Sequence, residues 1–319
     1  MSKSKLSYWK NHPGSAILRL LVWVAAFLTV AVMAFLVGFI LIKGVGNLKP
    51  ELFALEYNSD NASLMPALIN TLIITLLSLV IAVPFGVFAA IYLVEYAKKG
   101  SRLVKIIRLT TETLQGIPSI IFGLFGLLFF STALHWGYSL LAGSMTLVIM
   151  ILPLIIRTTE EALLGVPDAY REASLGLGAG KLRTVFKVVL PSAIPGILSG
   201  VVLATGRIVG ETAALIYTAG SVAKVPSSLM GSGRTLAVHM YVLSSEGLYM
   251  DQAYATAVIL LIFVLVLNWV SGVCAKHLSK AAISVDFPEP EGPIMATYSP
   301  SSIEKFTSFR TGTVIFPCW

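Results

Sequence analysis

Two charged residues interrupt a long apolar run between residues 193 and 217, and their types and spacing could bind an anion. Arg207 and Glu211 are four residues apart, so a helix places both side chains on one face. A guanidinium group at the centre of a membrane-spanning helix costs about 2.5–3.5 kcal/mol on insertion scales, so it needs a partner or a water-filled cavity. One interpretation is an internal ion pair between Arg207 and Glu211 that ties helices together. The other is a pathway site, where Arg207 gives a passing oxyanion a bidentate partner and Glu211 pairs with Arg207 when the site is empty.

A second stretch, EASLGLGAGKLRTVFKVVLP at residues 172–191, raises the question of nucleotide binding. A phosphate-binding P-loop requires the pattern G-x-x-x-x-G-K-[ST]. Here Leu175 stands where the first glycine is needed, and Leu182 replaces the Ser or Thr. The glycines of residues 176–180 follow no predicted strand, so a dinucleotide fingerprint fails as well. The stretch therefore does not predict a nucleotide site.

The same stretch is better described as two short helices joined by a glycine turn. Asp168 is a good N-cap for the first helix, and the glycines of residues 176–180 end it. The second helix carries an apolar stripe at i, i+3, i+4 and i+7, and we expect Pro191 to end it. The stripe consists of Leu182, Val185, Phe186 and Val189. It could lie on a membrane surface, or it could dock the segment against a partner.

The composition predicts a membrane protein. Of the 319 residues, 56% are hydrophobic and only 12% are charged, whereas soluble domains carry about 25% charged residues. Runs of about 20 apolar residues can cross a bilayer, and six such runs are present. They are Ile17–Ile42, Pro66–Val94, Ile117–Leu134, Leu140–Ile156, Ala193–Tyr217 and Ala253–Ala275. We therefore expect an all-α, polytopic membrane protein with about six transmembrane helices.

The basic residues indicate the orientation of these helices. Most of them lie at residues 3–19, 98–108, 157–187 and 276–280, all on one side of the predicted membrane. The opposite loops hold only Lys43, Lys49, Lys224 and Arg234. The positive-inside rule then places both termini in the cytoplasm. It also explains the formal net charge of +7 without nucleic acid.

The remaining sequence shows neither metal spacing nor a disulfide framework. Cys274 and Cys318 are far apart, and the four histidines are scattered. We expect no cofactor, no metal and no catalytic group in this chain. We divide it into a cytoplasmic N-terminus (1–16), a transmembrane domain (17–282) that contains a cytoplasmic loop (157–192), and a Pro- and Ser-rich tail (283–319) expected to be disordered.

The loop carries the residues of a known signature. The chain reads Glu172-Ala173-Ser174, then Gly178, then Val188-Val189-Leu190-Pro191. This resembles the E-A-A, three residues, Gly, nine residues, I-x-L-P pattern of ABC-importer permeases, with Ser and Val as mild departures. In that family the loop forms coupling helices that sit in a groove of the ATPase subunit. The resemblance thus implies coupling roles for Glu172, Ala173, Gly178, Val188, Leu190 and Pro191.

Three further segments narrow the resemblance. Residues 112–126, 152–167 and 206–220 are similar to the phosphate-importer permeases of the PstA type. That likeness implies that Arg157, like Arg207, lines the substrate pathway, with Arg157 at its inner mouth, although Arg157 could also be a basic anchor at the membrane surface. It implies an inner-membrane subunit that works with an ATP-binding subunit, a second and non-identical permease, and an extracytoplasmic phosphate-binding protein.

Two alternatives stay open. The substrate could be another oxyanion, such as sulfate or molybdate. A standalone secondary transporter, with the loop lying on the bilayer, would belong to a different class. The spacing of Gly196, Gly200, Gly206 and Gly210 also predicts close helix packing, which we expect to involve the second permease subunit.

Overall fold

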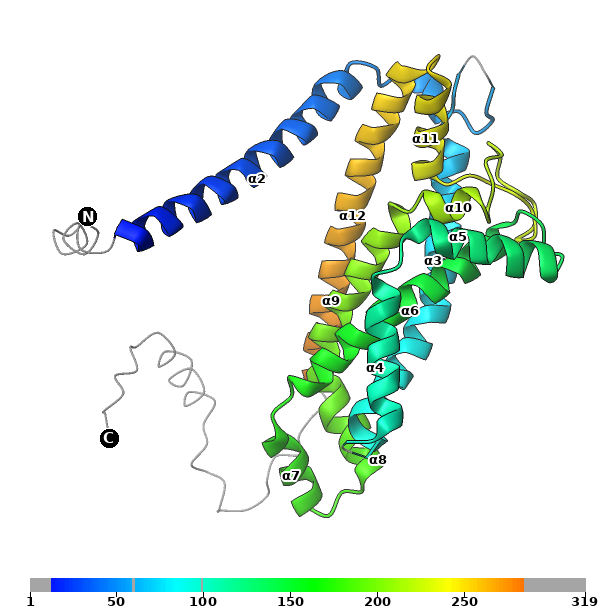
Figure 1. Cartoon of the computed structure of the whole chain (residues 1–319). Helices are drawn as coiled ribbons and strands as arrows, with labels where there is room; N and C mark the ends of the chain where they lie inside the picture. The colour runs from blue at the N-terminus through cyan, green and yellow to red at the C-terminus, as the bar shows by residue number, and fades with distance from the viewer. Residues whose placement is uncertain (1–12, 59–60, 99, 284–319) are drawn as a thin grey trace.

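A computed structural model of the chain describes residues 13–58, 61–98 and 100–283 (Figure 1). These residues form helices joined by turns, with no β-strand among them. The predicted tail lies almost entirely outside the described residues, as do residues 1–12 of the predicted N-terminal segment. The helices are α2 (Pro13–Val45), η1 (Pro50–Phe53), α3 (Met65–Ile91), η2 (Tyr92–Tyr96), α4 (Arg102–Gln115), α5 (Ser119–Gly126), η3 (Leu127–Ala133), α6 (Leu140–Leu164), α7 (Asp168–Gly176), α8 (Lys181–Thr184), η4 (Val185–Val189), α9 (Leu190–Val209), α10 (Ala213–Ile216), α11 (Leu236–Glu246) and α12 (Met250–Ile283).

Five helical stretches of the described chain are long and apolar enough to cross a membrane. They are Ile17–Val45, Met65–Tyr96, Leu140–Leu164, Lys181–Val209 and Met250–Cys274. A sixth crossing is possible only if α4 and the α5–η3 segment act together, because these two are bent by 101° relative to each other. This confirms an all-α protein with five to six spans.

The predicted third span, Ile117–Leu134, therefore does not qualify as a span by itself and counts only together with α4. The bend falls at Gly116, Ile117 and Pro118, between the end of α4 and the start of α5. Proline lacks the N–H that a helix needs and disfavours helical geometry in the residue before it. As a result α4 runs along the bundle, whereas α5 lies across it (Figure 1).

The core of the molecule lies where α3, α6 and α9 pack together. Ile74 of α3, Ile151 and Ile155 of α6, and Ile208 of α9 are almost fully buried there. In the most apolar part of α6, 67% of the residues are buried inside the chain, compared with none in α2. The α2 helix leaves the bundle near the start of α12 and extends away from it (Figure 1).

Small residues bring α6 and α9 into close contact. A Cβ atom on Gly196 would lie 2.6 Å from Cβ of Ala162, and one on Gly200 would lie 2.7 Å from Cβ of Thr158. These two glycines thus pack against α6 within the chain, whereas the expected packing against a second permease subunit stays a prediction. By contrast, a Cβ on Gly206 would meet no atom within 4 Å.

The fifth predicted span differs from the structure at both ends. The helix begins at Lys181 and continues through η4 into α9, ending at Val209 rather than Tyr217. Pro191 does not end it, contrary to our prediction. The backbone N–H of Leu190 bonds to the carbonyl of Val185, five residues earlier, and this π-helical turn directly precedes the proline. Such π-helical turns occur mostly as single turns inside longer α-helices.

Candidate functional site

Arg207 lies in the last turn of α9, partly exposed, and its guanidinium group makes no hydrogen bond or ion pair with any described residue. The predicted pair with Glu211 is absent because α9 ends at Val209, which breaks the i, i+4 register. Glu211 is buried, and its Oε1 accepts a hydrogen bond from the backbone N–H of Ala214 at 3.0 Å. It thereby holds the start of α10, and it does not pair with Arg207.

Arg157 of α6 is held by two carboxylates. Its Nε donates to Oε1 of Glu161 at 3.1 Å, and its Nη1 lies 3.6 Å from Oε1 of Glu112 on α4. Arg108 of α4 pairs with Glu160 of α6 beside them. The Arg157 side chain is 47% exposed, so it lies at the surface of the chain with its two carboxylate partners.

The packing of α6 on α9 relates the two arginines. Thr158 contacts Gly200, so Arg157 lies near the level of Gly200 along the bundle. Arg207 is seven residues further along α9, which corresponds to about 10 Å at 1.5 Å per residue. Arg207 therefore lies closer than Arg157 to the end of the bundle that carries α11, and Arg157 lies closer to the end that carries α7 (Figure 1).

The expected helix–turn–helix at residues 168–191 is present at one end of the bundle (Figure 1). Glu172 and Ala173 of α7 are exposed. Gly178 makes the turn with φ of +81°, a conformation that glycine adopts without strain. Asp168 is the first residue of α7 rather than its N-cap, which is Pro167. Along the following helix, Val188, Leu190 and Pro191 are partly buried.

The apolar stripe of this segment divides into two pairs. Val185 and Val189 are buried against α3 and α6, so they anchor the segment to the bundle. Leu182 and Phe186 are exposed, as is Leu177 in the turn before them. Half of the stripe is thus part of the core, and the other half is exposed.

Sequence reasoning missed Arg171 of α7. Its guanidinium group reaches Glu95 in η2 and two carbonyl groups at the end of α6. A glutamate within the otherwise apolar stretch of residues 91–97 was the signal that could have drawn attention to it.

A buried polar cluster at the other end of the bundle was also missed. Arg234 is 4% exposed and lies 4.6 Å from the centroid of the Tyr57 ring, and His239 packs edge-on against the same ring. Burial, followed by the neighbouring positive charge of Arg234, lowers the pKa of His239 to about 3, although the Ala62 carbonyl acts in the opposite sense. His239 belongs to α11, which is not a candidate span.

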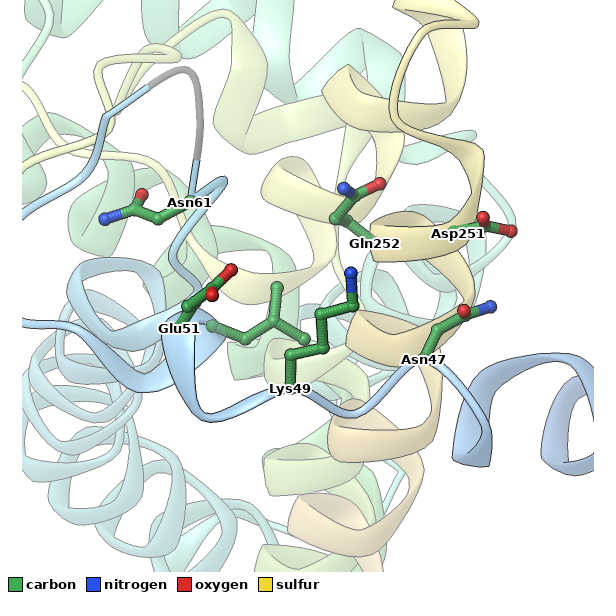
Figure 2. Close-up of a pocket in the computed structure, with 7 residues that line it drawn as sticks. Asn47, Lys49, Glu51, Asn61, Asp251 and Gln252 are labelled. Carbon is green, nitrogen blue, oxygen red and sulfur yellow. The ribbon is translucent and has the colours of Figure 1, made fainter.

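A small polar pocket lies at this same end of the bundle, where α12 begins. Figure 2 shows Lys49 extending between Glu51 and Asn47 toward the helix that carries Asp251 and Gln252. Because the Lys49 side chain brings a positive charge into this pocket, the pocket does not suit a metal cation. Within the described ranges, no three His, Cys, Asp or Glu side chains gather as a metal site.

Comparisons with known proteins agree with this architecture. Residues 82–283 match the family described as "Binding-protein-dependent transport system inner membrane component". The chain is 33% identical over 276 residues to the probable ABC transporter permease protein YqgI of Bacillus subtilis (strain 168), covering 80% of this chain and 94% of that one. It is 35% identical over 232 residues to the phosphate transport system permease protein PstA of Pasteurella multocida (strain Pm70), covering 71% of this chain and 81% of that one.

A solved structure shares the fold. It is a bacterial ABC transporter involved in the import of the acidic polysaccharide alginate, with a TM-score of 0.60 at 17% identity, and the match covers 86% of this chain and 99% of that chain. Identity this low supports the fold alone. The family match spans more than half of the sequence, and the Bacillus relative is aligned over nearly its whole length. The chain therefore belongs to the binding-protein-dependent transport system inner membrane components, the permease subunits of ABC importers.

Proposed function

We propose that this permease imports inorganic phosphate and that Arg207 contacts the anion on its way through the membrane. The observation that carries the proposal is a partly exposed guanidinium group, in the last turn of a membrane-spanning helix, without a carboxylate partner among the described residues. Arginine presents several N–H donors in a planar fork that matches a tetrahedral oxyanion. Relatives named as phosphate permeases support phosphate as that oxyanion.

Arg157 receives the anion after Arg207 in this scheme. Glu112 and Glu161 compensate the charge of Arg157 when no phosphate is bound. A phosphate group moving along the pathway replaces these carboxylates. Competition between carboxylates and phosphate keeps the site from becoming a deep trap, which would stall transport. Glu211 takes part by fixing the turn that follows Arg207.

We further propose that residues 157–192 couple the permease to an ATP-binding subunit. Exposed Glu172 and Ala173, together with the turn at Gly178, form the face that the partner contacts. Val188, Leu190 and Pro191 join this face to α9, which carries Arg207. Closure of the ATPase would thus reorient the helix that lines the pathway, as alternating access requires.

The complete importer then contains a second, non-identical permease and an extracytoplasmic phosphate-binding protein. We place both termini of this chain in the cytoplasm, because the basic residues gather at the α7 end of the bundle. Nucleic acid has no part in this function. The membrane domain corresponds to residues 17–282, with segments 1–16 and 283–319 outside it.

An uptake assay in vesicles that contain the whole importer tests the proposal. Unlabelled phosphate should reduce the uptake of radiolabelled phosphate, whereas sulfate and molybdate should not. The variant Arg207→Gln should assemble with its partners and lose phosphate uptake, and Lys43→Gln, which changes an exposed cation at the end of α2, should transport normally. Normal uptake by Arg207→Gln would show that Arg207 does not contact the anion, and equal competition by sulfate would reject phosphate specificity.

A further inference from the structure

Arg171 joins three elements through one guanidinium group. Its Nε and Nη2 donate to the same Oε1 of Glu95, at 3.0 and 2.9 Å. Its Nη2 also donates to the carbonyl of Leu163 at 2.8 Å, and its Nη1 to the carbonyl of Val166 at 2.7 Å. A further bond from Nη1 reaches Asp168 within α7 at 3.1 Å. Arg171 thus links α7 both to η2, at the end of α3, and to the end of α6.

These contacts are sheltered from solvent although α7 itself is not. The side chains of Arg171 and Glu95 are 17% and 9% exposed, whereas no residue of α7 is buried and Glu172 and Leu175 are exposed. An ion pair out of water is screened less than one on the surface, so it holds its geometry more firmly. The two carbonyls belong to the last turn of α6 and its exit, where the helix dipole favours a positive charge.

Two further contacts strengthen the same junction. The hydroxyl groups of Ser174 and Thr184 lie 2.9 Å apart, which closes α7 onto α8. The Nζ of Lys181, at the start of α8, lies 5.1 Å from the centroid of the Tyr96 ring at the end of η2. The glycine turn is thereby held from both sides against the end of α3.

We propose that Arg171 is the positioning residue that makes α7 move as one body with the ends of α3 and α6. This rests on the proposed function, in which an ATPase subunit displaces α7. With the clamp intact, such a displacement acts on α3 and α6 directly, in addition to the route through α8 and α9. Without it, α7 follows the ATPase while the ends of the two core helices stay behind.

The geometry requires arginine rather than any cation. Its planar fork serves a carboxylate and two carbonyls at once, whereas the ammonium group of lysine is a single compact donor centre. Arg171→Lys should therefore preserve the charge opposite Glu95 and lose contact with the carbonyls of α6. Glu95→Gln should keep an acceptor and lose the charge. Arg102→Lys provides the matched control, because Arg102 is exposed at the same end of the bundle.

The clamp can be measured in the full chain in nanodiscs, independently of transport. Spin labels are placed at Tyr92 of η2 and Leu175 of α7, which are 54% and 51% exposed, after serine has replaced both native cysteines. The distance distribution between the labels should be narrow in the parent and in Arg102→Lys. It should broaden at least twofold in Arg171→Lys. An equally narrow distribution in Arg171→Lys would overturn the clamp.

Its role in coupling is measured in the reconstituted importer as ATP hydrolysed per phosphate transported. We expect this ratio to rise several-fold in Arg171→Lys and in Glu95→Gln while the ATPase subunit still copurifies. The double variant should be no worse than the more severe single one, since both remove the same link. An unchanged ratio, or loss of the ATPase subunit from the purified complex, would overturn the coupling role. If the parent complex carries no phosphate, the proposed function fails, and the distance measurement still decides on the clamp.

Discussion

Thr158 of α6 occupies the space that a side chain at Gly200 of α9 would need, with its Cβ 2.7 Å from the position of a Cβ on that glycine. This contact fixes how closely the two helices approach and therefore the relative level of Arg157 and Arg207. The substrate pathway proposed above depends on it.

We predict that Gly200→Leu destabilises the protein by about 1–3 kcal/mol, the usual cost of forcing extra atoms into a packed interface. The loss should appear as a lower midpoint of thermal unfolding in detergent. Gly206→Leu is the matched control, because a Cβ there meets no atom of the chain within 4 Å. Equal midpoints for the two variants would show that α6 and α9 do not pack as described.

A second prediction concerns the turn between α7 and α8. Gly178 has φ of +81°, and no atom lies within 4 Å of the position that a Cβ would take. The cost of a substitution there therefore comes from the backbone conformation and not from a steric clash. Gly178→Val should strain the turn by about 1–2 kcal/mol, whereas Gly178→Asn should be tolerated, since asparagine visits this conformation. ATPase activity stimulated by substrate should fall in the valine variant only. A parallel fall in both variants would indicate a side-chain clash with the partner instead.

Glu211 offers a third prediction that separates its two interpretations. The structure uses its Oε1 as an acceptor for the buried N–H of Ala214. Glu211→Gln retains that acceptor and should leave both stability and phosphate uptake near the parent values. Glu211→Ala leaves the buried N–H of Ala214 without an acceptor and should lower the free energy of unfolding by about 1–3 kcal/mol. If instead Glu211→Gln alone abolishes uptake, the negative charge matters, and Glu211 acts as a counter-charge during transport.

The fourth prediction follows from His239, whose pKa is lowered to about 3 from an ordinary value of 6.5 by burial and by Arg234. Between these pH values the His239 imidazole is protonated in the unfolded chain and neutral in the folded chain. The contribution of neutral His239 to stability is therefore complete above pH 6.5 and is lost progressively as the pH falls toward 3. By pH 5 the loss should reach about 2 kcal/mol.

His239→Gln should flatten the pH dependence of the unfolding midpoint, and His135→Gln, an exposed control, should not. An unaltered slope in His239→Gln would place the dependence elsewhere.

The sequence by itself determined the class of protein. Long apolar runs have no stable place except a bilayer, so the all-α membrane architecture and the start of four of the spans follow from hydropathy. The turn between two short helices was also predictable, because it depends on local residues, and the resemblance of the motif around Glu172, Gly178 and Pro191 to a known signature indicated the permease family.

Contacts between distant residues were decided only by the tertiary structure. Hydropathy cannot show the 101° bend before α5, because an apolar helix that lies across the bundle has the same hydropathy as one that spans the membrane. Helical periodicity predicted a pair between Arg207 and Glu211. However, α9 ends between these residues, and Glu211 instead accepts a hydrogen bond from the backbone N–H of Ala214. The clamp between Arg171 and Glu95 joins residues 76 positions apart. Local patterns carry no information about such a pair, because it forms only when α3, α6 and α7 meet at one end of the bundle.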